Sequence, residues 1–264
     1  MKTTRLTALT LALMLPGTAW AQDTGDAEAR GLEIAIEADR RDTGFVSQTA
    51  ALTMVLRNRH GEESTREMRV NTLEVVSDGD KSLVVFDRPG DVAGTALLSF
   101  THKTESDDQW LYLPALRRVK RIASNNKAGP FMGSEFAYED LASQEVEKYT
   151  YRFVGHDSID GADTLVVERM PVDRNSGYSR QVVWWDAAEY RVRKVDYYDR
   201  KGTLLKTLTM SEYEQHLSSF WRAGRMEMIN HQTGKSTVLA WEDYKLDADL
   251  DARDFDQASL RRAR

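Results

Sequence analysis

The chain contains no cysteine. This excludes disulfide bonds, thiolate nucleophiles and cysteine-ligated metal sites. The nucleophile elbow G-x-S-x-G, the Walker A loop, the dinucleotide fingerprint G-x-G-x-x-G and the zinc motif H-E-x-x-H are also absent. We therefore predict no cofactor, no metal site and no enzymatic activity. A periplasmic hydrolase built on scattered His and Asp residues remains an alternative, because side chains that only folding brings together, such as paired carboxylates, cannot be recognised in a sequence.

Long apolar runs are scarce, and the clearest one lies at the N-terminus. Lys2 and Arg5 precede the apolar residues 6–15, a Pro-Gly pair ends that run, and the small residues Ala19 and Ala21 precede the expected cleavage position after Ala21. This is the layout of a secretory signal peptide. The run is shorter than the ~20 apolar residues of a membrane-spanning helix. We predict an exported, soluble, periplasmic protein whose signal peptide covers residues 1–21.

The remaining residues, 22–264, are expected to form a single domain. The net charge of the chain is −6, and loss of the signal peptide would make it more negative. A negative net charge disfavours binding to nucleic acid and to anionic membrane surfaces, so we expect only transient contact with a membrane.

A helix is expected first, over residues 26–41, with Leu32, Ala35 and Ile36 as its apolar stripe and Gly44 beyond its end. Short segments rich in Val, Leu, Thr and aromatic residues then alternate with Gly-containing turns, without helices between them, which indicates an antiparallel sheet or barrel. The expected strands are 47–58, 65–77, 82–88, 94–102, 109–114, 117–122, 148–155, 162–170, 179–186, 190–198, 203–213, 218–230 and 235–245.

Alternation within the strands indicates that both faces of the sheet are covered. Around residues 109–114, Leu111 and Leu113 point to one face, whereas Trp110 and Tyr112 point to the other. Residues 203–213 place an apolar face on one side, interrupted by Lys206. The charged C-terminal segment, 247–264, carries two apolar residues, Phe255 and Leu260, which are expected to dock a final short helix.

Residues 123–145 interrupt the strand pattern. They begin as a polar loop, continue through Phe131 and Met132, and are expected to form a short helix over 135–144 that includes Phe136 and Tyr138. Large apolar side chains in a loop have to be buried somewhere. The segment therefore indicates a lid over a cavity, with an ordinary loop packed on the core as the alternative.

The most basic stretch lies in one predicted strand. Arg117 and Arg121 share a face with Val119, and Arg118 and Lys120 take the other. Such a run is typical of a solvated edge strand, where basic side chains discourage edge-to-edge pairing. It also fits a docking patch for an acidic partner or a lipid phosphate, which arginine binds through its planar donor fork.

Three stretches resemble a known family: Leu97–Lys103 (LLSFTHK), Gln109–Ile122 (QWLYLPALRRVKRI) and Gly133–Leu141 (GSEFAYEDL). They are similar to the outer membrane lipoprotein-sorting protein family, a LolA-like branch of the LolA/LolB lipoprotein-carrier superfamily. The resemblance implies a mainly β fold: an incomplete, strongly curved antiparallel β-barrel of about eleven strands with an N-terminal helix and a short helical lid. It also implies a concave face that binds acyl chains, and partners among inner-membrane exporters of the RND/MMPL type.

We therefore predict a carrier that binds lipid or lipoprotein acyl chains in an apolar cavity and moves them toward the outer membrane. The alternative is an adaptor or sensor module that docks an exporter or an envelope-stress partner and carries no cargo. The expected cavity and lid residues are Leu97, Phe100, Trp110, Tyr112, Phe131, Met132, Phe136, Tyr138, Met210 and Trp241. The expected partner or head-group contacts are Arg117, Arg118, Lys120 and Arg121.

Overall fold

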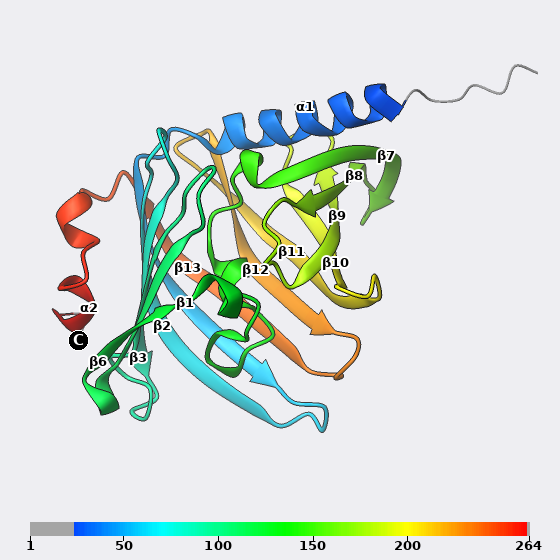
Figure 1. Ribbon diagram of the computed structural model, residues 1–264. Helices are drawn as coiled ribbons and strands as arrows, with labels where there is room; N and C mark the ends of the chain where they lie inside the picture. Colours follow the sequence, from blue (N-terminus) through cyan, green and yellow to red (C-terminus); the bar gives the residue numbers. More distant parts are fainter. Residues whose placement is uncertain (1–23, 263–264) are drawn as a thin grey trace, which may run out of the picture.

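A computed structural model describes residues 24–262, which form a strongly curved antiparallel sheet of thirteen strands. The strands follow one another from β6 back to β1, then from β13 back to β7, so β6 and β7 are the two edges. The edges do not pair, and the sheet is therefore an open half-barrel (Figure 1). The expected signal peptide and its cleavage position after Ala21 lie outside the described residues.

The mainly β class and the open antiparallel sheet confirm the prediction. Each of the thirteen ranges expected from the sequence holds one strand, whereas the resemblance implied about eleven. The strands are β1 Ser47–Arg57, β2 Glu63–Leu73, β3 Lys81–Arg88, β4 Ala96–Phe100, β5 Asp108–Leu113, β6 Arg118–Ile122, β7 Tyr149–Ile159, β8 Ala162–Pro171, β9 Tyr178–Asp186, β10 Val192–Asp199, β11 Leu204–His216, β12 Phe220–Asn230 and β13 Ser236–Leu246.

Helix α1, Thr24–Asp42, lies across one end of the half-barrel and packs on β7 (Figure 1). Its buried stripe differs from the expected one: Ile34 and Ala35 are buried, whereas Leu32 and Ile36 are exposed. The reason is Gly31, whose missing side chain lets the helix backbone approach β7. A Cβ atom at position 31 would lie 2.8 Å from the backbone nitrogens of Arg152 and Phe153. None of the described helices is both long and apolar enough to cross a membrane.

The two faces of the sheet carry separate apolar clusters. The larger one lies on the concave face and includes Leu97 and Leu111. The smaller one lies on the convex face, where the C-terminal segment with helix α2, Ser259–Arg262, covers β3, β4 and β5. Phe255 and Leu260 are 2 % and 0 % exposed there, which confirms that they dock the C-terminal segment.

We predict that Gly31→Ala destabilises the fold. Replacing glycine in a helix interior by alanine normally stabilises a helix by ~1 kcal/mol. At this position the added methyl group would force α1 away from β7, and overpacking of this kind costs ~1–3 kcal/mol. Urea denaturation followed by circular dichroism should give a lower free energy of unfolding for the variant.

Gly90→Ala is the matched control, because no heavy atom lies within 4 Å of a Cβ atom built at that exposed glycine. Its free energy of unfolding should stay within ~0.5 kcal/mol of the wild type. A Gly31→Ala protein more stable than the wild type would contradict the close packing of α1 on β7.

Candidate binding face and lid

The connection between the two edge strands packs on the concave face, which agrees with the ordinary packed loop given as the alternative; we call this segment the lid after its proposed role. This lid, residues 123–148, contains four 3₁₀ turns: Ser124–Asn126, Phe131–Gly133, Tyr138–Leu141 and Val146–Lys148. The α-helix expected over 135–144 is therefore absent. Its place is taken by the 3₁₀ turn Tyr138–Leu141, which is capped at its start by the Asp140 carboxylate accepting the backbone N–H of Ala137 at 2.6 Å. Loops longer than ~12–15 residues are often functional lids.

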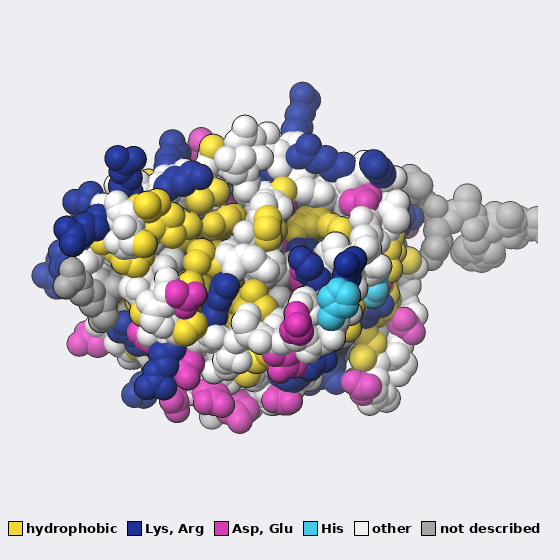
Figure 2. Space-filling view, turned by 90° about the horizontal axis from the view of Figure 1, so that it is seen from below, with side chains coloured by type: hydrophobic (Ala, Val, Ile, Leu, Met, Phe, Trp, Pro, Cys, Tyr) yellow, Lys and Arg dark blue, Asp and Glu magenta, His cyan; other side chains and the backbone are white. Residues whose placement is uncertain are grey.

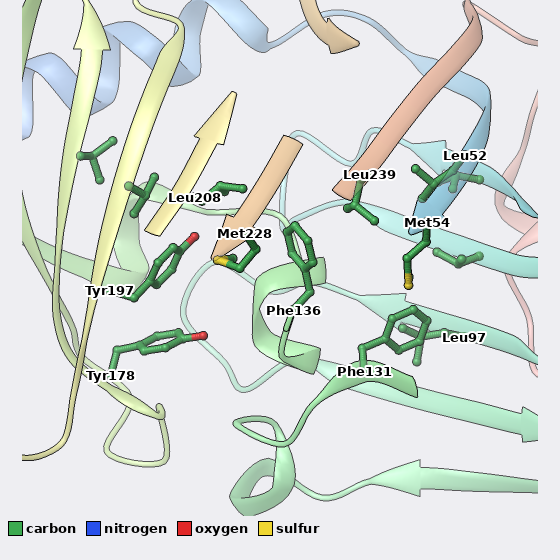
Figure 3. Close-up of a cluster of buried hydrophobic side chains, with 14 of the residues drawn as sticks. Leu52, Met54, Leu97, Phe131, Phe136, Tyr178, Tyr197, Leu208, Met228 and Leu239 are labelled. Atoms are coloured by element: carbon green, nitrogen blue, oxygen red, sulfur yellow. The ribbon is translucent and has the colours of Figure 1, made fainter. Parts of the chain in front are cut away.

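Two phenylalanines of the lid fill the concave face. Phe131 is 1 % exposed and lies beside Met54 and Leu97, with its ring 5.7 Å from that of Phe86 (Figure 3). Phe136 is 3 % exposed and lies near Met228 and Leu239 (Figure 3). The sequence led us to expect an unfilled apolar cavity. In the structure the lid's own side chains occupy that space, because close packing recovers dispersion contacts that a void would forfeit.

A pocket of ≈ 280 Å³ lies where the lid meets the tips of the β1–β2 and β12–β13 hairpins. Gly133 and Glu135 of the lid, Leu56 and Arg57 of β1, and Thr237 of β13 are among the residues that line it. Ligand pockets usually measure ~300–1,000 Å³ and are mostly apolar. With the lid in this position, the pocket is slightly smaller than most ligand pockets, and charged side chains such as Arg57 and Glu135 are among those that line it.

Polar contacts fasten the lid to strands on both sides of the half-barrel. On one side, Arg66 of β2 donates to the Met132 carbonyl at 2.5 Å and Gln109 of β5 donates to the Tyr138 carbonyl at 3.0 Å. On the other, Asn230 of β12 donates to the Glu135 carboxylate at 2.7 Å. The lid is thus held closed by many separate hydrogen bonds, each of modest net value.

A buried ion pair lies among these contacts. The Lys206 ammonium on β11 is 2.7 Å from the Asp140 carboxylate, and their side chains are 5 % and 4 % exposed. Lys206 also donates to the Glu135 carbonyl at 2.9 Å, and the Tyr178 hydroxyl donates to Asp140 at 2.8 Å. Burial raises the pKa of Tyr178 well above its usual value, so this hydroxyl keeps its proton and remains a donor. Sequence reasoning missed this pair, although Lys206 interrupts an otherwise apolar face.

The predicted cavity residues divide between the two faces of the sheet. Phe100, Trp110 and Tyr112 lie in the convex cluster beneath the C-terminal segment, so they do not line the concave face. Strand alternation places them there, since each lies next to a residue that faces the concave side. The predicted residues found in the concave cluster are Leu97, Phe131, Met132, Phe136, Tyr138, Met210 and Trp241. Within residues 24–262, the indole nitrogen of Trp241 is buried without a hydrogen-bond partner.

The predicted basic contact residues lie along strand β6, an open edge of the sheet, with Arg117 directly before it. Arg121 pairs with Asp108, whereas Arg117, Arg118 and Lys120 have no ion pair among the described residues. Seen from the end opposite α1, hydrophobic side chains gather between groups of Lys and Arg side chains (Figure 2). The described residues contain no group of three or more His, Asp or Glu side chains arranged to hold a metal ion.

Solved structures share this fold. A Vibrio parahaemolyticus protein described as an outer membrane lipoprotein-sorting protein domain is 54 % identical, with a TM-score of 0.87 over 89 % of this chain and 99 % of its own. A DUF1329 family protein from Desulfovibrio piger is 31 % identical, with a TM-score of 0.84 over the same shares. A LolA superfamily protein from Nitrosomonas europaea is 22 % identical, with a TM-score of 0.70 over 87 % of this chain and 98 % of its own.

A family model described as "Uncharacterized protein" matches residues 78–262. A search of the curated proteins found no match to this chain.

A cluster of carboxyl groups lies where the lid joins β7. Glu145 is 8 % exposed, and its pKa is raised to about 7 by burial and by the charges of Asp80 and Asp39. Burial likewise raises the pKa of Asp80 to about 6, although its carboxylate accepts a hydrogen bond from Ser143 of the lid at 3.2 Å. Lys103 and Lys148 lower the pKa of Glu145 to a smaller extent. The base of the lid therefore favours a protonated Glu145.

We predict that Glu145 makes stability fall as pH rises. Its pKa is higher in the folded protein than the usual 4.5, so the folded state holds the proton more tightly and its contribution is lost between pH 4.5 and about 7. Glu145→Gln should match the wild type at pH 5 and exceed its free energy of unfolding by ~1–3 kcal/mol at pH 8. Urea denaturation at the two pH values measures this difference.

Glu147→Gln, at an exposed position of the same turn, is the control and should give the same small difference at both pH values. A Glu145→Gln difference that does not change between pH 5 and pH 8 would show that this carboxyl is not buried as described.

Proposed function

Because the chain belongs to the outer membrane lipoprotein-sorting protein family and shares the fold of a LolA superfamily protein, we propose that it is a carrier for acyl chains. In this proposal the concave face binds a lipid or lipoprotein acyl chain and delivers it toward the outer membrane. The expected signal peptide supports a periplasmic location. Binding and release require no bond chemistry, which fits a protein that is not an enzyme.

The observation that carries the proposal is the apolar plug formed by Phe131 and Phe136. Both side chains belong to a connecting segment and not to the sheet, so they can leave the concave face without unfolding it. An acyl chain that takes their place buries methylene groups worth ~0.8 kcal/mol each. Cargo and lid therefore compete for the same apolar surface, formed in part by Leu97, Met228 and Leu239.

The contacts that hold the lid suit reversible opening. Arg66 and Lys206 bind backbone carbonyls of the lid, Met132 and Glu135 respectively. The lid itself consists of short 3₁₀ turns, whose hydrogen bonds have poorer geometry than those of an α-helix. Opening of the lid thus breaks several modest interactions and does not disrupt a cooperative interface between a helix and the sheet. Segments that move in this way usually belong to the less stable parts of a fold.

We predict that removing the plug strengthens cargo binding. In the Phe131→Ala/Phe136→Ala variant the lid no longer occupies the concave face, and a fluorescent fatty-acid probe enters without displacing aromatic rings. The dissociation constant of the probe should fall by ~10-fold relative to the wild type, equivalent to ~1.4 kcal/mol. Fluorescence titration measures it, and mass spectrometry of lipid extracted from protein purified out of its native envelope identifies the natural cargo.

Phe255→Ala is the matched control, because it removes an equally buried ring from the convex face. Each variant should lose stability, since truncating a buried phenylalanine costs ~3–5 kcal/mol, but only the lid variant should bind the probe more tightly. The absence of probe binding to both the wild type and the lid variant would contradict the carrier proposal.

The basic edge strand supports a second element of the proposal, contact with an acidic surface. Arg117, Arg118 and Lys120 are exposed, and they lie close in sequence to Leu116, a leucine that is 64 % exposed. Basic side chains around an exposed apolar residue suit the anionic surface of a membrane, where a carrier exchanges its cargo. The same surface also suits an acidic exporter partner, the basis of the alternative adaptor function.

We predict that Arg118→Glu/Lys120→Glu slows transfer of a bound fatty-acid probe to vesicles containing phosphatidylglycerol by ~10-fold and leaves its dissociation constant unchanged. The reason is loss of electrostatic attraction to the vesicle surface, which is worth ~1 kcal/mol per basic residue. Arg30→Glu/Arg40→Glu on α1 makes the same change in net charge at another site and should not slow transfer. Equal transfer rates for all three proteins would contradict membrane docking by β6.

A further inference from the structure

Lys206 is a buried cation whose carboxylate partner belongs to the lid. Its ammonium group projects from β11, 2.7 Å from the Asp140 carboxylate. The rings of Tyr178 and Tyr197, which contact each other, have their centroids 5.1 and 5.2 Å from the ammonium group. The nearby Glu139, also in the lid, is bound instead by Ser176 and Gly177 at 2.8 Å each.

Opening of the lid would separate this pair unequally. Lys206 stays in the sheet, between apolar side chains of the concave face, while Asp140 moves away with the lid. A buried ammonium group left without a counter-charge is strongly unfavourable. The two tyrosine rings offer cation–π contacts, which do not replace a full negative charge. An open lid therefore requires either water or another anion at Lys206.

The lid combines its anion with an apolar group in the way that an amphiphile does. Phe136 lies four residues before Asp140, and its ring lies near Met228 and Leu239 (Figure 3). The Asp140 carboxylate binds the Lys206 ammonium group and accepts a hydrogen bond from the Tyr178 hydroxyl. An acyl chain with an acidic head group carries the same two features in the same order. The lid thus covers the concave face with an internal counterpart of such a molecule.

We infer that the cargo is an acyl amphiphile with an acidic head group, carboxylate or phosphate, which replaces Asp140 at Lys206 and Tyr178 while its chain replaces the phenylalanine plug. This inference rests on the proposed carrier function and narrows it to a class of cargo. Lys206 supplies the charge, and the protonated Tyr178 hydroxyl supplies a second donor. A neutral acyl ester would leave Lys206 unpaired and bind more weakly.

Competition against the fluorescent fatty-acid probe at pH 7.5 tests the inference with palmitate, lysophosphatidic acid and methyl palmitate. Wild-type protein should bind the acids at least ~10-fold more tightly than the ester, and the preferred acid distinguishes a carboxylate from a phosphate head group. Lys206→Met should reduce this preference to about onefold, chiefly by strengthening binding of the ester, because the ester then leaves no buried ammonium group unpaired. Asp140→Asn, which removes the competing carboxylate, should bind the acids more tightly than the wild type.

Lys194→Met is the matched control, because Lys194 also pairs with a carboxylate, that of Asp196 on the same strand β10. Val195 and Tyr197, which alternate with this pair along the strand, face the concave core, so the Lys194–Asp196 pair lies on the opposite face. It should keep the wild-type preference. The double variant Lys206→Met/Asp140→Asn removes both charges and should show no preference even where Lys206→Met alone does not fold. Equal binding of acid and ester by the wild type, or an unchanged preference in the double variant, overturns the inference. Loss of all acyl binding in the wild type and in the lid variant instead overturns the carrier function on which it rests.

Discussion

An open sheet with two apolar faces has to be covered on both, and this requirement explains the arrangement of the other segments. Concave and convex faces each carry a buried apolar cluster. The edges β6 and β7 do not pair, so neither cluster is enclosed by closure of the barrel. The C-terminal segment covers the convex face, and the lid, which joins the two edges, covers the concave one. A cover made from a connecting segment contributes no strand, so its contacts are separate from the strand pairing of the sheet.

Alternation of residue types was sufficient to predict much of this fold. Leu111 and Trp110 are both apolar neighbours in one strand, so the sequence required a cover on each face. The structure confirms it, with Leu111 in the concave cluster and Trp110 under the C-terminal segment. Phe255 stands out in a charged tail and was expected to dock for the same reason. The pattern could not say which face was concave, and three aromatic residues were therefore assigned to the wrong side of the sheet.

Contacts between residues far apart in the chain could not be predicted from the sequence. Lys206 and Asp140 are 66 positions apart, and nothing in the pattern of either segment identifies the other as its partner. The available signal was Lys206 itself, a charge within an apolar face, because a buried charge requires a counter-charge. The filled concave face was missed for a related reason: periodicity gives the direction of a side chain in a strand, but not where a loop such as Phe131–Gly133 will place its aromatic ring.

The proposed exchange of the lid for cargo requires a lid that is not held too tightly, and the buried Lys206–Asp140 ion pair adds little net stability. The free energy that a buried ion pair gains from attraction is nearly offset by the hydration free energy that its two charges lose. The pair therefore contributes more to the choice of partner than to stability. Phe131 and Phe136 supply the apolar contact, and Asp140 supplies the charge. A ligand that offers both groups can replace the lid at small net cost, whereas one that offers only an apolar chain leaves Lys206 unpaired. Under the proposed function, the surface that packs against the lid therefore discriminates acidic from neutral acyl chains.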